Sequence, residues 1–162
     1  MRLYIFTLLL TLILPSLAIA GDDPFAAQRA IFVKMLPKAE AGDWSSVEPQ
    51  MNALQGYPLA PDLRAAWLRR KVGKATDSEI DAYLRKYPDL AFSYGLRLRW
   101  AKSLASRRAW PQYLAIYDAH YADSGDTVLH CWALRGRIAT GANDGLEESA
   151  MAIWLSAFSQ PK

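Results

Sequence analysis

Apolar side chains recur every three to four residues through nearly all of this chain after its first twenty residues, and Pro or Gly interrupts each series. The clearest series has i, i+4 spacing and consists of Phe92, Leu96, Trp100 and Leu104. It runs through YGLRLRW (94–100), a segment that taken alone alternates like a β-strand. Only a helix keeps such a series on one face. The spacing therefore predicts helices throughout and no strand.

Start and stop signals divide the chain into about eight helices joined by short turns. Asp43 or Trp44 opens a second helix that reaches Leu54, and the run from Thr76 to Glu79 has the pattern of a capping box. Successive helix pairs are roughly 30 to 40 residues long, which is the scale of helical repeats. A helix pair cannot cover its apolar face alone. The sequence therefore predicts an all-α fold, a superhelical stack of helical hairpins (α-solenoid).

Two prolines, Pro58 and Pro61, mark the junction between the first and second helix pairs. We expect Tyr57–Leu59 to cross between the pairs in an extended conformation. Pro61 then fits the first turn of the third helix, where its missing amide costs nothing. Two prolines this close restrict the angle at which the next pair docks.

The first twenty residues have the layout of a secretory signal peptide. A short positive start, Met1-Arg2, precedes an apolar run over 3–14, and Ala18-Ile19-Ala20 supplies small residues at a cleavage site. The apolar run is too short to span a bilayer as a helix. We expect cleavage after Ala20, export to the periplasm and no stable membrane anchor thereafter. An uncleaved anchor is the alternative.

Residues 21–162 are then one domain's worth of chain. The net charge of +3 falls to +2 without Arg2, and so small a balance does not suggest a nucleic-acid partner. Cys131 is the single cysteine. In an oxidising compartment this indicates either a buried inert thiol or a missing partner. No cofactor-binding motif is present.

Several segments resemble, in order, the N-terminal superhelical region of soluble lytic murein transglycosylases. They are QRAIFVKMLPKAEAGDWSSV (28–47), YPLAPDLRAAWL (57–68), AFSYGLRLRWAKSLASRRAWPQYLAIY (91–117), and HCWALRGRIATG (130–141) with LEESAMAIWLSAFSQP (146–161). Members of that family cleave the bond between N-acetylmuramic acid and N-acetylglucosamine and leave a 1,6-anhydro product. Their catalytic glutamate belongs to a separate lysozyme-like domain. The resemblance implies that 21–162 is a truncated α-superhelical domain without that catalytic domain, which would lie on a separate chain.

No catalytic or metal site stands out from the residues. Glu148-Ser149 matches the family's catalytic Glu-Ser pair only in its letters, because too few residues follow for a lysozyme-like fold; we interpret it as a solvated helix face. His120, His130 and Cys131 match no zinc spacing, so we expect packing or surface roles and no metal.

Two basic clusters, around the third and fifth predicted helices, are candidates for binding the anionic groups of peptidoglycan. The candidate glycan-binding residues are Arg64, Arg97, Arg99, Arg107 and Arg108. The alternative is a solvated helix face with i, i+4 partners.

The resemblance also gives Cys131 an interpretation. Family members carry a second cysteine shortly after the position of Ser159-Gln160-Pro161. The resemblance therefore implies that Cys131 is an unpaired (orphan) cysteine whose disulfide partner would lie beyond Lys162.

Three hypotheses about function follow. The first is a peptidoglycan-binding superhelical part of a periplasmic lytic transglycosylase, inactive by itself. The second is a free-standing periplasmic helical-repeat adaptor for a protein partner. The third, an enzyme active in its own right, is the one we do not expect.

Overall fold

The computed structural model describes residues 23–74 and 76–155; the predicted signal peptide and the segment Ser159–Pro161 lie outside these ranges. The α-helices within them are α1 (Ala26–Ala41), α2 (Trp44–Val47), α3 (Ala60–Lys71), α4 (Asp77–Lys86), α5 (Ala91–Ser106), α6 (Trp110–His120), α7 (Thr127–Thr140) and α8 (Leu146–Trp154). Two short 3-10 helices, η1 (Glu48–Gln50) and η2 (Asn52–Leu54), follow α2. The described residues contain no strand, so the predicted all-α class is confirmed.

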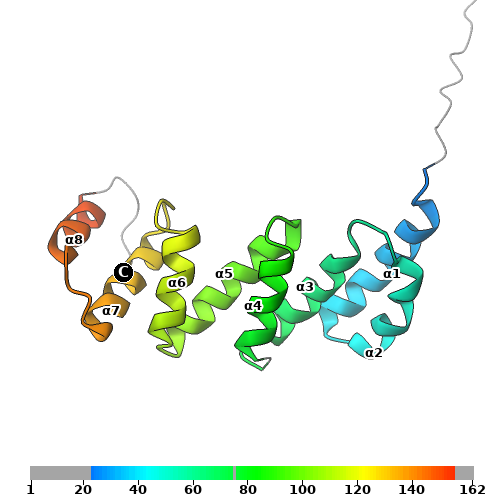
Figure 1. Ribbon diagram of the computed structural model, residues 1–162, viewed down its shortest axis with the longest axis horizontal. Helices are drawn as coiled ribbons and strands as arrows, with labels where there is room; N and C mark the ends of the chain where they lie inside the picture. Colours follow the sequence, from blue (N-terminus) through cyan, green and yellow to red (C-terminus); the bar gives the residue numbers. More distant parts are fainter. Residues whose placement is uncertain (1–22, 75, 156–162) are drawn as a thin grey trace, which may run out of the picture.

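The helices follow one another in chain order along the long axis of the molecule, from α1 at one end to α8 at the other (Figure 1). The most extensive helix contacts join α1 to α3, α3 to α5, and α6 to α7. Because α3 lies between α1 and α5, these helices form a continuous inner row. Helices α4 and α6 both contact α5, which makes them successive members of a second row.

Two apolar clusters form the core along this stack. The first lies around α1, the 3-10 helices and α3, and includes Phe32, Leu54 and Leu63. The second extends from α3 to α7. Trp67 and Phe92 pack against both clusters, so the core is continuous through the middle of the molecule.

Helix α5 confirms that the alternating segment 94–100 is helical. Leu96 and Leu104 are fully buried and Trp100 is 5% exposed, all within the central cluster. Burying each such side chain contributes about 1.5–3 kcal/mol. The long i, i+4 series decides the conformation because a strand would divide it between two faces.

The second predicted helix is only partly correct. Asp43 does cap its start, accepting a hydrogen bond from the Ser46 amide at 3.2 Å, but α2 ends at Val47. Pro49 follows two residues later, and a proline ring clashes with the carbonyl four residues earlier in a continuing α-helix. The chain instead reaches Leu54 through η1 and η2, which still bring Val47 and Leu54 to full burial.

The predicted capping box at the start of α4 is wrong. Thr76 occupies the N-cap position but its side chain makes no capping hydrogen bond; its Oγ1 instead accepts from the Ser78 hydroxyl at 3.1 Å. Glu79 does not reach back, because its carboxylate pairs with Arg64 on α3. A long-range ion pair replaces the local capping hydrogen bond.

The junction at the prolines is a turn and not an extended segment. The Ala60 amide donates to the Tyr57 carbonyl at 3.0 Å, which closes the turn with Pro58 inside it. Proline favours this position because its φ is fixed near the value that the turn requires. Pro61 lies in the first turn of α3, as predicted.

Helix α8 ends the described stack without a buried residue. Met151, Trp154 and Leu155 are 56%, 74% and 74% exposed. Within the described ranges no helix has both the length and the apolar character needed to cross a bilayer.

Candidate functional site

A groove runs between α4 and α6, with α5 beneath it. Two adjoining cavities of about 300 and 220 Å³ make it up, and both are lined by Asp81, Arg85, Trp100 and Ile116. The remaining residues of this α4–α6 groove are Asp77, Ser78, Leu84, Pro88, Arg97, Gln112, Ala115 and His120. It therefore combines an indole, several planar polar side chains and small apolar surfaces.

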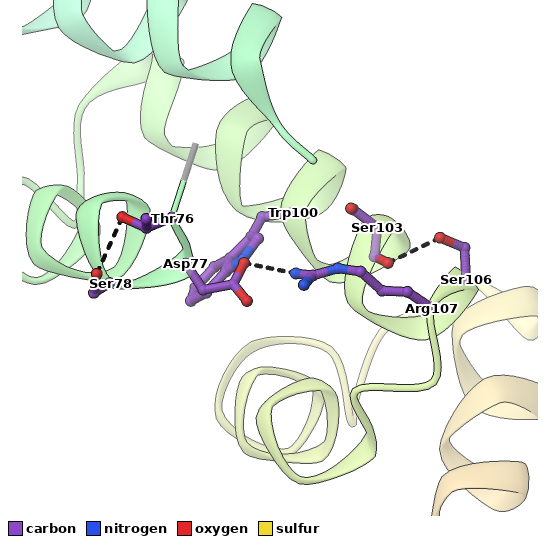
Figure 2. Close-up of polar contacts among 7 residues, drawn as sticks. All are labelled: Thr76, Asp77, Ser78, Trp100, Ser103, Ser106 and Arg107. Atoms are coloured by element: carbon purple, nitrogen blue, oxygen red, sulfur yellow. Dashed lines mark hydrogen bonds and ion pairs between the residues drawn. The ribbon is translucent and has the colours of Figure 1, made fainter. Parts of the chain in front are cut away.

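Asp77, at the start of α4, organises one end of the groove. Its Oδ1 accepts hydrogen bonds from Trp100 Nε1 at 2.8 Å and from Arg107 Nη2 at 2.6 Å. Figure 2 shows the three side chains coming together from the start of α4, from within α5 and from the residue that follows α5. Burial acts to raise the pKa of Asp77, but the hydrogen bonds from Arg107 and Trp100 outweigh it and leave that pKa lowered. Asp77 is thus an ionised acceptor.

The middle of the groove contains one ion pair and one side-chain amide without a hydrogen-bond partner. Asp81 and Arg85, one turn apart on α4, form an ion pair, which raises the pKa of Arg85. Gln112 on α6 is exposed and makes no side-chain hydrogen bond within the described ranges. Its amide is available to a ligand.

Arg97 and His120 lie at the other end. Arg97 is only 9% exposed, and its Nη2 donates to the Pro88 carbonyl at 3.0 Å. Partial desolvation of the ring, and then the charge of Arg97, lower the pKa of His120. The imidazole is therefore kept neutral and can both donate and accept hydrogen bonds.

The structure places the five predicted glycan-binding arginines in different surroundings. Arg97 lines the groove, and Arg107 acts on it through Asp77. Arg64 lies over the rings of Trp44 and Trp67, at 4.8 and 4.3 Å from their centroids, and pairs with Glu79. Arg99 and Arg108 are exposed and have no ion pair among the described residues.

The residues weighed for catalysis and metal binding are dispersed. Glu148 is exposed in the first turn of α8. Both ring nitrogens of His130 are in use, one with the Tyr117 hydroxyl and one with the Ser124 carbonyl. Cys131 is half-buried in α7 with a free thiol. Among the described residues no group of three His, Cys, Asp or Glu side chains could hold a metal ion.

Sequence reasoning missed most of the groove. Trp100 was assigned to the core only, Asp77 to a local cap, and Gln112 was not singled out. The i, i+4 pair Asp81 and Arg85 was a detectable signal for an exposed polar face of α4. Nothing in the sequence shows that α6 lies opposite α4 across α5. The groove residues of α4 and those of α6 are 20 or more positions apart in the chain.

The arrangement suits binding more than acid catalysis. A carboxyl that protonates a glycosidic oxygen needs a raised pKa, whereas the pKa of Asp77 is lowered. Ionised Asp77, neutral His120 and the Gln112 amide offer acceptors and donors around an aromatic floor, the mixture that orients a polar ligand in a mainly apolar pocket.

Comparison with known proteins confirms the resemblance found in the sequence. The chain is 24% identical over 144 residues to the soluble lytic murein transglycosylases of Escherichia coli K12 and O157:H7, which covers 89% of this chain and 22% of theirs. The Salmonella typhimurium LT2 enzyme of the same name is 24% identical over 143 residues, 88% of this chain and 22% of that one. The chain thus spans about a fifth of the length of these relatives. No family model and no solved structure matches it.

Proposed function

We propose that this chain is the superhelical part of a periplasmic murein lytic transglycosylase, and that it binds peptidoglycan glycan strands without cleaving them. The observation that carries this proposal is the similarity to soluble lytic murein transglycosylases over 89% of the chain. Because the similarity covers 144 residues, it is not confined to one helix pair.

The α4–α6 groove supports the proposal as the binding site. Its two cavities share four lining residues and are lined by side chains from α4, α5 and α6. A glycan strand presents hydroxyl and acetamido groups on one side of each ring and C–H surface on the other. Asp77, Gln112 and His120 provide partners for the former, and Trp100 with Ile116 provides apolar surface for the latter.

Cleavage is assigned to a lysozyme-like catalytic domain and not to the described helices. Glu148, the one residue whose letters match the family's catalytic pair, is exposed and does not line the cavity that the neighbouring Ser149 lines.

Sedimentation with purified sacculi tests binding, and analysis of the soluble products tests cleavage. We expect the purified chain to sediment with sacculi and to release no 1,6-anhydro muropeptides. Release of such products by this chain alone would show that it is itself the enzyme. A chain that stays in the supernatant would contradict peptidoglycan binding.

A matched pair of α6 variants locates the site. Ala115 is exposed and lines the groove, whereas Ala119 is exposed on the same helix outside it. Ala115→Gln narrows the groove and is expected to weaken sedimentation at least tenfold, while Ala119→Gln leaves it unchanged. Equal effects of the two substitutions would move the binding site elsewhere.

The second candidate, a helical-repeat adaptor for a protein partner, is favoured by one observation. The exposed apolar side chains of α8, Trp154 and Leu155 among them, are of the kind that protein interfaces cover. Failure to bind sacculi, together with a stable complex with a periplasmic protein that Trp154→Ser abolishes, would favour this function.

A further inference from the structure

A second pocket, on a different part of the stack, is lined by two arginines. It lies between the α5–α6 turn and α7, has a volume of about 280 Å³, and is lined by Arg108, Trp110, Arg135, Ile138 and Ala139. None of these residues belongs to the α4–α6 groove. We call it the Arg108–Arg135 pocket.

The guanidinium groups of both arginines lack partners among the described residues. Neither the Arg108 nor the Arg135 side chain makes a hydrogen bond, an ion pair or a cation–π contact with any described residue. This contrasts with Arg64, Arg85, Arg107 and Arg137, which all pair with carboxylates. Two guanidinium groups that share a pocket without a counter-ion repel one another and attract an anion.

The backbone at Arg108 is strained in a way that points to a requirement for its side chain. Its φ is +59°, and among the described residues it is the one non-glycine residue with a positive φ. The five further residues with a positive φ are all glycines, namely Gly42, Gly56, Gly73, Gly141 and Gly145. Arg108 closes α5 at a position where glycine is preferred, with its amide bonded to the Ala105 carbonyl at 3.1 Å. Such strain is characteristic of functional positions.

The rest of the pocket is apolar and small. Ile138 is 62% exposed beside the partly buried indole of Trp110. Gly136 allows this arrangement, because a Cβ there would lie 3.2 Å from Trp110 Cε3. The volume lies at the lower limit for small-molecule pockets. It suits the end of a short peptide and not a disaccharide.

We propose that the Arg108–Arg135 pocket binds the carboxylate of a peptide that ends in a small apolar residue, namely the peptide stem of peptidoglycan. The two guanidinium groups hold the carboxylate, and Trp110 with Ile138 covers the adjoining methyl group. The identity of the peptide rests on the proposed function, whereas the preference for a carboxylate next to an apolar side chain does not. The α4–α6 groove would then bind the glycan part of peptidoglycan, and this pocket would bind the peptide part of the same polymer.

The direct test is a calorimetric titration with N-acetyl-alanyl-alanine and with its C-terminal amide. We expect the acid to bind at least tenfold more tightly than the amide. Arg108→Gly and Arg135→Gln should each weaken binding of the acid at least tenfold. The control Lys34→Gln, which removes one exposed charge on α1, should bind as the parent does.

Arg108→Gly separates binding from folding. Glycine relieves the strain of a positive φ, so this variant should melt roughly 2–4 °C higher than the parent while it binds less. Equal affinity for acid and amide, no saturable binding of the acid, or unchanged binding by Arg108→Gly would each overturn the proposal.

Sedimentation with intact sacculi and with glycan strands that lack peptide distinguishes peptide binding by this pocket from the proposed glycan binding. Arg108→Gly should sediment less with intact sacculi and as well as the parent with glycan strands stripped of peptide by an amidase. If the parent sediments with neither material, the proposed function fails while the dipeptide titration still decides the pocket. If it sediments with both and Arg108→Gly matches it on intact sacculi, the pocket does not bind the stem.

Discussion

Two aspartates on successive helices, Asp62 and Asp77, have opposite effects on stability. Asp62 on α3 is 1% exposed and its Oδ1 has no hydrogen-bond partner within the described residues. Burial raises its pKa, and the backbone amide of Phe92 only partly opposes this. Asp77, bound by Arg107 and Trp100, has a lowered pKa. Asp62 is therefore destabilising when ionised, whereas Asp77 is stabilising.

Asp62→Asn should raise the free energy of unfolding at neutral pH, by up to about 1 kcal/mol, because a neutral amide of the same shape loses less on burial than a carboxylate. The raised pKa makes the folded state bind more protons than the unfolded one above pH 3.8. The parent therefore loses stability as the pH rises from there through the folded-state pKa. Urea denaturation at a series of pH values should show a gap between variant and parent that widens as the pH rises. A gap that is independent of pH would contradict this account.

Asp77→Asn should have the opposite pH profile. Its lowered pKa means that the carboxylate's contribution is complete above pH 3.8 and disappears as the pH falls through the folded-state value. At pH 7 we expect a loss of about 1–2 kcal/mol, since hydrogen bonds to a charged group are weakened. The same denaturation series should show the difference closing at acid pH. Parallel curves would mean that the charge of Asp77 is not what ties α4 to α5.

At the scale of helices, Gly136 and Gly95 are two helix-interior glycines with different surroundings. A Cβ on Gly136 would lie 3.2 Å from Trp110 and 3.3 Å from Leu114, whereas one on Gly95 would meet only Arg69 Nη1, at 3.6 Å. The first glycine permits a close approach of α6 and α7. The second has room for a side chain.

Gly136→Val should therefore destabilise the protein by about 1–3 kcal/mol, because the added methyl groups force α6 away from α7. Gly95→Ala is the matched control and should stabilise it by about 0.5–1 kcal/mol through helix propensity. Thermal unfolding followed by circular dichroism compares the two. A destabilising Gly95→Ala, or a neutral Gly136→Val, would show that helix spacing is not set by these glycines.

The sequence predicted helices better than it predicted what lies between them. Periodicity is a local property, so the series through Trp100 identified α5 correctly, and Pro61 marked the first turn of α3. The break after Val47, the turn at Pro58 and the pairing of Glu79 with Arg64 depend on competition between local and distant partners. The α4–α6 groove was missed for the same reason, since it exists only where α4, α5 and α6 are already packed.

At the scale of the whole molecule, the stack has a gradient of burial. Helices α3 and α5 have neighbours on both sides and contain Leu63, Leu68, Leu96 and Leu104 at full burial. Helix α8 makes its most extensive contacts with α7 and has no buried residue among those described. In a stacked repeat each helix pair is stabilised by its nearest neighbours, so stability depends on position in the row.

Native-state amide hydrogen exchange should report this gradient directly. We expect amides in α3 and α5 to exchange only through global unfolding, with the highest opening free energies in the chain. Amides in α8 should open by several kcal/mol less, because undocking this helix exposes little additional apolar surface. The free energy of α8 opening should also be insensitive to urea, whereas that of α5 should fall steeply with it. If α8 were as protected as α5 in the isolated chain, the energetics would be those of one cooperative unit and the nearest-neighbour account of this stack would be wrong.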